Sequence, residues 1–176
     1  LVDSAEVVGG KNVTEAIPAT SSAIKFKIGP PNAFTPAELN TFAKVVQSES
    51  QVSSAGLLQR IKQAKMLCCV IDNGKMVATA AAKGPNSSYH EDVFDSAGVP
   101  ELAGKYPYEM GWKVVLPTHR GQKLGAIMSS KIIQKIDSPV FATIRANNAV
   151  ALNQSKSIGF TELGKPFTGS SGNKII

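Results

Sequence analysis

Apolar and polar residues follow patterns along the first part of the chain that predict one strand and then two helices. Residues 23–28 alternate with the period of two that is typical of a half-buried strand. Thr35 is expected to cap a helix, because Pro36 takes the first helical position and Glu38 completes a capping box. Ser53 is expected to begin a second helix, whose apolar face is formed by Leu57, Leu58, Ile61 and Ala64.

The middle of the chain is predicted to form a β-hairpin followed by a long connection. Two apolar strands, residues 67–71 and 76–82, flank the dipeptide Asn73-Gly74, which is the strongest short signal for a hairpin turn. Residues 84–107 contain several proline and glycine residues, and we expect a long connection there. Connections of this length are often functional or mobile.

The last third of the chain is predicted to alternate strands with helices. The expected strands are residues 109–116, 140–146 and 161–167, and the expected helices are residues 123–136 and 148–158. Gly159 is expected to end the second of these helices, and residues 169–173 are expected to form a turn. The full order, β-α-α-β-β-β-α-β-α-β, predicts an α/β fold. Its mixed, mostly antiparallel central sheet would have helices on both faces.

The same pattern predicts how the chain is divided and where its tryptophan lies. Residues 1–21 have no clear period and are expected to form an arm, whereas residues 22–176 are expected to form one domain. Trp112 alternates with Met110 and Val114, so we expect all three side chains to pack in the core from one face of a strand.

Length and composition agree with one folded domain. A chain of 176 residues can bury roughly 70% of its unfolded surface, and an apolar fraction of 43% excludes a wholly disordered chain. There is no run of about 18 apolar residues, so no membrane span is predicted. The first residues lack the basic and apolar pattern of a secretory signal, so none is expected there.

The two cysteines, Cys68 and Cys69, are adjacent in a predicted strand. Neighbours on a strand point to opposite faces, which is poor geometry for a disulfide. Two cysteines with no histidine at ligand spacing also make no zinc site. We therefore interpret both as buried apolar residues, with a reactive thiol as the alternative, and a cytoplasmic protein is expected.

The net charge of +6 suits a polyanionic partner. Nucleic acid, an anionic membrane surface and a phosphorylated cofactor all fit this charge. The basic residues are spread thinly and never form a block of five or six. Charge therefore narrows the classes of partner without selecting one.

Residues 114–126 are the segment that carries recognisable chemistry. A strand enters a short turn containing Gly121, and the turn opens directly onto a helix that contains Gly125. Backbone N–H groups at such a turn converge at the positive end of the helix dipole, and Arg120 and Lys123 add full charges. The pattern fits an anion site equally well as a plain strand-to-helix corner. Neither a nucleotide-binding P-loop, a dinucleotide fingerprint nor a hydrolase elbow occurs.

Two segments resemble the signatures of one family. Residues 117–126 resemble the pyrophosphate-loop motif of the GNAT superfamily of N-acetyltransferases, written Gln/Arg-x-x-Gly-x-Gly/Ala. Residues 148–160 resemble the second signature of that family, an Asn before a helix of small and apolar residues and then Gly-Phe. Two positions depart from the pattern. Lys123 replaces the first motif glycine, and Ser155 stands where many relatives have a tyrosine that protonates the leaving thiolate.

The resemblance implies a GNAT-like acyl-CoA N-acyltransferase fold, whose sheet opens at its fourth strand to hold acetyl-CoA (coenzyme A). The strand end would bind the pantetheine arm, the loop amides would bind the pyrophosphate, and Asn148 would lie near the far end of the arm. The cofactor-binding residues implied are Val114, Val115, Leu116, Arg120, Gly121, Gln122, Lys123, Leu124, Gly125, Ala126 and Asn148.

The implied reaction is direct transfer of an acyl group to an amine on a small molecule or a protein. Glu109 is the candidate base, because it lies eleven residues before Arg120, where some family members place a catalytic glutamate. The alternative is a strand glutamate that faces solvent or pairs with Lys105 or Lys113. No metal, nucleic acid or membrane is expected to take part, and a homodimer is compatible with the sequence.

Ser155 is the second candidate catalytic residue. If it cannot act as the general acid, Tyr106, Tyr108 or water would have to do so. Of the two histidines, His119 is expected to be structural or to face solvent. His90 is expected to lie in a surface loop, although with its acidic neighbours it suits a cationic substrate.

Two rival functions remain open at this stage. Ser155 and Lys123 favour a catalytically weak or inactive GNAT-like protein that binds coenzyme A and has a regulatory role. The net charge allows a nucleic-acid-binding domain with an unrelated α/β fold, which would bind DNA or RNA with a steep salt dependence.

Overall fold

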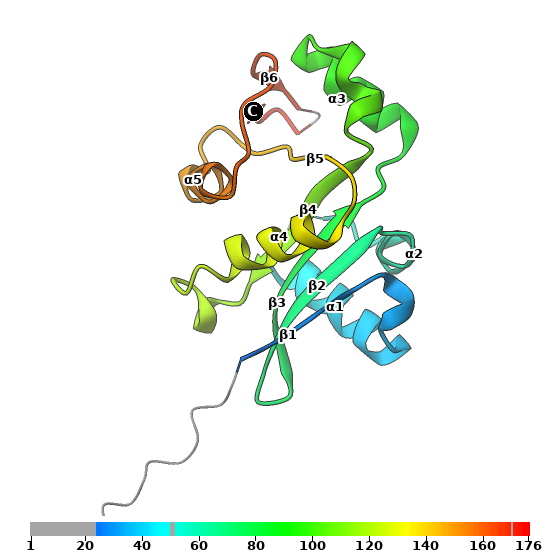
Figure 1. The fold of residues 1–176 in the computed structure, drawn as a ribbon, viewed down its shortest axis with the longest axis vertical. Helices are drawn as coiled ribbons and strands as arrows, with labels where there is room; N and C mark the ends of the chain where they lie inside the picture. Colours follow the sequence, from blue (N-terminus) through cyan, green and yellow to red (C-terminus); the bar gives the residue numbers. More distant parts are fainter. Residues whose placement is uncertain (1–23, 50–51, 170) are drawn as a thin grey trace, which may run out of the picture.

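The computed structural model describes residues 24–49, 52–169 and 171–176, so the predicted arm at residues 1–21 lies outside the described residues (Figure 1). The strands are β1 Lys25–Gly29, β2 Met66–Asp72, β3 Lys75–Lys83, β4 Tyr108–Val115, β5 Val140–Phe141, β6 Phe167–Thr168 and β7 Lys174–Ile175. The α-helices are α1 Pro36–Glu49, α2 Leu57–Lys62, α3 Ser87–Ala97, α4 Leu124–Lys135 and α5 Ala149–Ser157. Three short 3-10 helices are η1 Pro31–Ala33, η2 Pro100–Lys105 and η3 Pro117–His119.

A five-stranded mixed sheet forms the centre of the fold, in the order β1-β2-β3-β4-β5. The first three pairings are antiparallel, and β4 pairs with β5 in parallel. One apolar cluster, which includes Phe42 and Leu57, packs α1 and α2 on one face of the sheet. A second cluster, which includes Met128 and Ile132, packs α4 on the opposite face (Figure 1). The predicted α/β class, with helices on both faces of a mostly antiparallel sheet, is confirmed.

The start of α1 confirms the predicted capping box. The Glu38 backbone N–H donates to Thr35 Oγ1 at 3.2 Å, and the Thr35 N–H donates to Glu38 Oε2 at 2.7 Å. Lys27 on β1 donates to the same carboxylate at 2.7 Å, and together these contacts lower the pKa of Glu38. Ser53, by contrast, does not begin α2. The helix starts at Leu57, because Gly56 immediately before it takes a left-handed conformation with φ of 66°.

The predicted hairpin is confirmed between β2 and β3. Asn73 and Gly74 both have positive φ, 48° and 74°, as the two central residues of a type I′ turn require. The strands also place the cysteines as predicted, since Cys68 packs in the α4-side cluster and Cys69 in the α1-side cluster, both fully buried. Burial raises the pKa of the Cys68 thiol to about 12 and that of Cys69 to about 11.

A β-bulge in β4 overturns the prediction that three side chains share one face. Thr79 on β3 pairs with Val114 and Ala81 pairs with Gly111, so two β4 residues lie opposite one β3 residue. Trp112 takes φ of 48° at the bulge, and its carbonyl accepts a hydrogen bond from the buried Thr79 hydroxyl at 3.0 Å. Trp112 and Val114 therefore pack on the α1 side, as core residues, whereas Met110 packs on the α4 side.

The expected long connection at residues 84–107 is wrong, because most of it is helical. Asn86 caps α3, since its side chain accepts a hydrogen bond from the Tyr89 N–H at 2.8 Å, and Gly98 ends the helix in a left-handed conformation. The 3-10 helix η2 follows. The inward face of α3 consists of Val93, Phe94 and Ala97, which pack toward β5.

The end of the chain forms a second, two-stranded sheet of β6 and β7 near β5. The predicted strand at residues 140–146 pairs with β4 only at Val140 and Phe141. It then pairs with the β7 region, because Ile144 and Ile176 exchange two backbone hydrogen bonds of 3.0 and 2.8 Å. The predicted strand at residues 161–167 is wrong, since the strand here, β6, comprises only Phe167 and Thr168. None of the helices that the structure describes is long and apolar enough to cross a membrane.

Candidate cofactor site

The sheet opens between β4 and β5. Tyr108 and Glu109 pair with Val140 and Phe141, and this is the whole of the pairing between the two strands. Beyond Glu109, β4 continues for six residues, about 20 Å at 3.3 Å per residue, with no described strand along that edge. An open strand edge presents backbone N–H and C=O groups to a binding partner. This opening is the feature that the resemblance implied at the fourth strand.

The open edge leads directly to the N-terminus of α4. After η3, residues 120–123 form a turn in which Gly121 has φ of 80° and Lys123 has φ of 57°. Lys123 is the cap residue of α4, and no side chain makes a capping hydrogen bond there. The first N–H groups of an α-helix have no partner within the helix, and they lie at the positive end of its dipole. The turn therefore has the geometry of an anion site.

Contacts with neighbouring strands hold this turn in place. His119 Nε2 lies 3.0 Å from Asp72 Oδ2 at the β2–β3 hairpin, and its Nδ1 lies 2.8 Å from Thr118 Oγ1. Arg120 Nε donates to the Val115 carbonyl at 3.2 Å. Of the two roles predicted for His119, the structure shows the structural one, because its ring connects η3 to the β2–β3 hairpin.

Gly125 lies in the first turn of α4 at a close approach of two other elements. A β-carbon at this position would lie 3.0 Å from Gln154 Oε1 on α5 and 3.3 Å from Lys113 Cδ on β4. The first turn of α4 is therefore lined by β4 and α5, and any larger residue at Gly125 would occupy the space between them. At the start of α5, Asn148 acts as the helix cap, accepting a hydrogen bond from the Ala151 N–H at 3.0 Å.

Lys113 places a positive charge beside this turn. Its side chain is half-buried, and burial lowers the pKa of the ammonium group. It has no ion-pair or hydrogen-bond partner among the residues that the structure describes. A half-buried ammonium without a partner costs free energy unless an anion compensates it. The expected pairing of Lys113 with Glu109 is wrong, because Glu109 pairs with Lys83.

Glu109 lies at the point where β4 and β5 separate, and the residue is 4% exposed. Oε1 accepts hydrogen bonds from Thr143 Oγ1 at 2.9 Å and from Tyr89 Oη at 3.3 Å. Oε2 lies 2.8 Å from Lys83 Nζ but accepts no hydrogen bond within the described part of the chain. The carboxylate is thus held in position from three elements while Oε2 keeps hydrogen-bonding capacity.

Tyr89 contributes a hydroxyl that stays protonated. Although 39% of the residue is exposed, its hydroxyl faces Glu109 and Thr143. Burial, followed by the negative charge of Glu109, raises the pKa of Tyr89 to about 12. A phenol with this pKa donates a hydrogen bond to the carboxylate across the physiological range.

Solved structures show which known architecture this arrangement matches. An acetyltransferase of the GNAT family from Streptococcus agalactiae superposes with a TM-score of 0.59 and 13% identity, over 85% of this chain and 92% of that chain. The protein yncA from Salmonella typhimurium, solved with its cofactor acetyl-CoA, gives 0.59 and 19%, over 88% and 91%. The ribosomal-protein-S18-alanine N-acetyltransferase from Escherichia coli gives 0.58 and 17%, over 86% and 89%.

The chain has the GNAT fold. No protein-family model matches the sequence, and neither does any curated protein. The likeness is therefore one of architecture, and it covers nearly the whole length of each of these neighbours. The alternative hypothesis of a nucleic-acid-binding domain required an unrelated α/β fold, and the observed fold does not meet this requirement.

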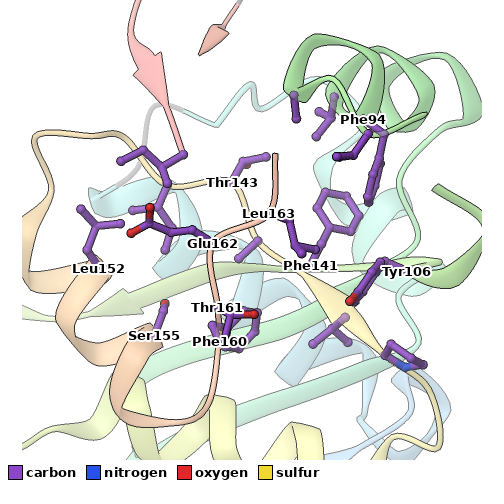
Figure 2. Close-up of a pocket in the computed structure, with 18 of the residues that line it drawn as sticks. Phe94, Tyr106, Phe141, Thr143, Leu152, Ser155, Phe160, Thr161, Glu162 and Leu163 are labelled. Atoms are coloured by element: carbon purple, nitrogen blue, oxygen red, sulfur yellow. The ribbon is translucent and has the colours of Figure 1, made fainter. Parts of the chain in front are cut away.

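Within the GNAT fold, the predicted residues fall into two groups. One group, Val114 to Leu116 and Arg120 to Ala126, follows the chain from the end of β4 through the turn into the first turn of α4, with the side chains of Val114 and Leu124 buried in the core. Ser155, which is 6% exposed, lies instead in the wall of a cavity between α5 and β5, and Tyr106 lines the same cavity (Figure 2). Tyr108 packs beneath the Lys65 ammonium, 5.7 Å from its ring centroid.

Three functional candidates escaped the sequence analysis. Tyr89 and Lys83 both contact Glu109, yet no local pattern links them to it, because they lie 20 and 26 positions away in the chain. Thr143 follows β5 and reaches Glu109 only once the parallel pairing forms. His90, expected in a surface loop, lies on α3, where its Nε2 is 2.9 Å from the Tyr106 carbonyl oxygen and its ring contacts Phe94 edge-on.

Proposed function

We propose that this protein is an acetyl-CoA-dependent N-acetyltransferase that transfers an acyl group directly to an amine. The observation that carries the proposal is the continuity of the open β4 edge with the uncapped N-terminus of α4. That edge begins at Glu109 and ends at the turn containing Gly121 and Lys123. Neighbours with this fold include structures that hold acetyl-CoA or CoA, which supports the same cofactor here.

The residues present fit such a cofactor. The amides of Gln122 to Ala126 and the ammonium groups of Lys113 and Lys123 would hold its pyrophosphate, which gives Lys113 the anion that it lacks in the free protein. The backbone of Val114 to Leu116 would hold the pantetheine arm, and Asn148 would lie near the far end of that arm. The absence of a side chain at Gly125 keeps the backbone of this turn accessible where Gln154 and Lys113 come close to it. Bound acetyl-CoA would supply an acyl group on a sulfur leaving group.

Glu109 is the base of the proposed mechanism. An amine must lose a proton to attack an acyl group, and in the proposed mechanism Glu109 takes it, directly or through water; Oε2, which is buried beside Lys83, accepts no hydrogen bond from the described residues. Thr143 and Tyr89 fix the carboxylate through Oε1, while the Lys83 ammonium lies 2.8 Å from Oε2 and balances its charge. Orientation of the amine against the bound acyl group would supply several kcal/mol of the rate acceleration.

The alternative is a GNAT-like protein that binds coenzyme A and has little or no activity. It is favoured by Ser155 in place of the tyrosine and by the ion pair that engages Glu109. Water or the Tyr106 hydroxyl would have to protonate the leaving thiolate if the protein is an enzyme. The amine acceptor, whether on a small molecule or on a protein, belongs to the same proposal. So does the cytoplasmic location.

Calorimetric titration with acetyl-CoA and with free CoA tests the cofactor. We expect micromolar binding to the natural chain and its loss in Gly125→Leu, because a side chain there would meet Gln154 and Lys113. Gly104→Leu is the matched control, since a β-carbon at Gly104 meets nothing within 4 Å. Absence of binding by the correctly folded natural chain would overturn the proposal.

A further inference from the structure

A cavity of about 310 Å³ lies between α3, the β5 segment, α5 and residues 158–165 (Figure 2). Its volume is within the range of small-molecule sites. Most lining side chains are apolar and come from all four walls, among them Val93, Phe94, Phe141, Leu152, Phe160 and Leu163. Figure 2 shows Leu152 and Ser155 on one side of the segment that carries Thr161, with Phe94 and Phe141 on the other.

The cavity reaches the proposed reaction centre. Phe141 and Thr143 both line it. Phe141 is the last residue of β5, and it pairs with Glu109 on β4. Thr143 Oγ1 donates to Glu109 Oε1 at 2.9 Å. One hydrogen bond therefore separates the wall of the cavity from the carboxylate at which the open edge of β4 begins.

The small side chain at Ser155 leaves room in this wall. Ser155 faces the cavity from α5, at the position where the resembling family signature has a tyrosine. A phenol ring there would fill part of the space that the serine hydroxymethyl group leaves open. The loss of the usual aromatic residue thus coincides with an apolar chamber at the end of the proposed cofactor cleft.

The charges around the cavity disfavour a cationic occupant. Among the side chains of its lining, one is a carboxylate, Glu162, which forms an ion pair of 2.9 Å with Lys156. Both of these side chains are more than half exposed, so the pair lies toward solvent. Lys165 is the remaining charged residue of the lining. A protonated amine would find the one side-chain carboxylate of the lining already paired, whereas a neutral apolar chain would bury its surface favourably.

We propose that this cavity binds the acyl chain of an acyl-CoA donor that is longer than acetyl. The inference rests on the proposed function, and it names the donor that the same site prefers. The thioester end of the donor would lie near Glu109 at the end of the open β4 edge, and the hydrocarbon chain would continue past Thr143 into the apolar chamber. The acceptor amine would approach from the other side of the thioester.

A series of CoA thioesters tests the proposal by calorimetry. Free CoA and the acetyl, butyryl, hexanoyl and octanoyl thioesters are titrated into the full chain. Full burial strengthens binding by up to about fourfold for each methylene group. We therefore expect hexanoyl-CoA to bind at least about tenfold more tightly than acetyl-CoA. Equal affinities across a series that does bind would overturn this inference and leave the proposed function standing. No binding by any member would overturn both.

Filling the cavity supplies the matched variants. Leu163→Trp and Val93→Phe each add volume to the lining, and we expect either to reduce the hexanoyl-to-acetyl ratio of affinities to within about threefold. Val150→Trp is the control, because Val150 is 68% exposed and lies outside the lining. A ratio that persists in both filled variants would overturn the proposal. Competition between hexylamine and hexanoyl-CoA would also overturn the proposal, because it would show that the cavity binds the acceptor amine.

Discussion

Lys83 Nζ lies 2.8 Å from Glu109 Oε2, and this ion pair joins β3 to β4 at the last residue where β4 also pairs with β5. The two side chains differ in burial, with 23% of the lysine side chain exposed and 5% of the glutamate side chain. The pair thus places a buried carboxylate at the mouth of the opening and balances its charge from the neighbouring strand.

Replacing Glu109 by glutamine should abolish most turnover while the cofactor still binds. A positioned general base contributes about 10²–10⁴-fold to a rate, so we expect kcat to fall at least about a hundredfold. Release of the CoA thiol in the presence of amine measures turnover, and calorimetry measures cofactor affinity. Unchanged kcat would remove Glu109 from the mechanism, and an inactive natural chain that binds CoA would favour the regulatory protein.

Replacing Lys83 by methionine should destabilise the fold, because it leaves Glu109 buried without a positive partner. Breaking a buried pair in this way typically costs about 3–5 kcal/mol in the free energy of unfolding. Lys75→Met, at an exposed position on the same strand, should change it by less than about 0.5 kcal/mol. Urea unfolding of the two variants compares them, and equal stabilities would show that the ion pair contributes little.

Lys123→Gly should stabilise the protein. Lys123 takes a left-handed conformation, which costs a residue with a β-carbon about 1–2 kcal/mol, and glycine avoids this cost at some expense in backbone entropy. We expect a net gain of about 0.5–1 kcal/mol in urea unfolding. Gln134→Gly, at an exposed position within α4, is the control and should lose about 1 kcal/mol. A loss in both variants would show that the lysine side chain stabilises the turn.

Lys113→Met should raise stability at neutral pH. Burial lowers the pKa of Lys113 in the folded chain, so between that value and the ordinary value of 10.5 the unfolded chain binds more protons. Stability therefore rises with pH through this window, and below it the full cost of the buried ammonium is present. The gain from the substitution should be largest at pH 7 and shrink as pH approaches 10.5. Urea unfolding at several pH values measures it.

The same variant should bind acetyl-CoA less tightly, because the ammonium compensates the pyrophosphate in the proposed complex. Calorimetry at low and high salt checks this expectation, and the difference between Lys113→Met and the natural chain should narrow as salt screens the charge. Equal affinities at low salt would show that Lys113 has no contact with the cofactor.

Gly164→Ala should disturb the cavity wall. Gly164 has φ of 68°, and a β-carbon there would lie 2.3 Å from the Ala97 carbonyl oxygen at the end of α3. Since the neighbouring Lys165 N–H donates to that same oxygen at 2.9 Å, the substitution should break this contact and lower the melting temperature. Gly104→Ala, in open space, should leave it unchanged. A melting temperature of Gly164→Ala equal to that of the natural chain would show that residues 160–165 can shift to accommodate the β-carbon without loss of stability.

Local signals predicted local structure well. The Asn73-Gly74 turn and the capping box at Thr35 each depend on residues within four positions, and the structure confirms both. The strand-to-helix turn at residues 120–125 was also visible, because its glycines and charges are contiguous in the sequence. The sheet class followed from the order of these elements.

Features that depend on a partner strand were hidden from the sequence. The bulge at Trp112 leaves the alternation of apolar residues intact, and the extra residue is apparent only against Thr79 and Ala81 on β3. Helix α3 was missed because only Val93, Phe94 and Ala97 of its eleven residues are buried. The contacts of Glu109 come from three separate elements, so no spacing along the chain could indicate them.

The junction of Ala97 with Gly164 and Lys165 has a consequence for how such a protein diversifies. The cavity beside β5 is lined by helix α3, which is inserted between β3 and β4, and by the segment that follows α5. The turn at residues 120–123, proposed to hold the phosphates, belongs to neither. Substitutions in these two segments would change the shape of the cavity without changing β4 or the turn that is proposed to bind the CoA part of the donor. Proteins that share this sheet and turn can therefore differ in the acyl group that they accept while they catalyse the same type of reaction.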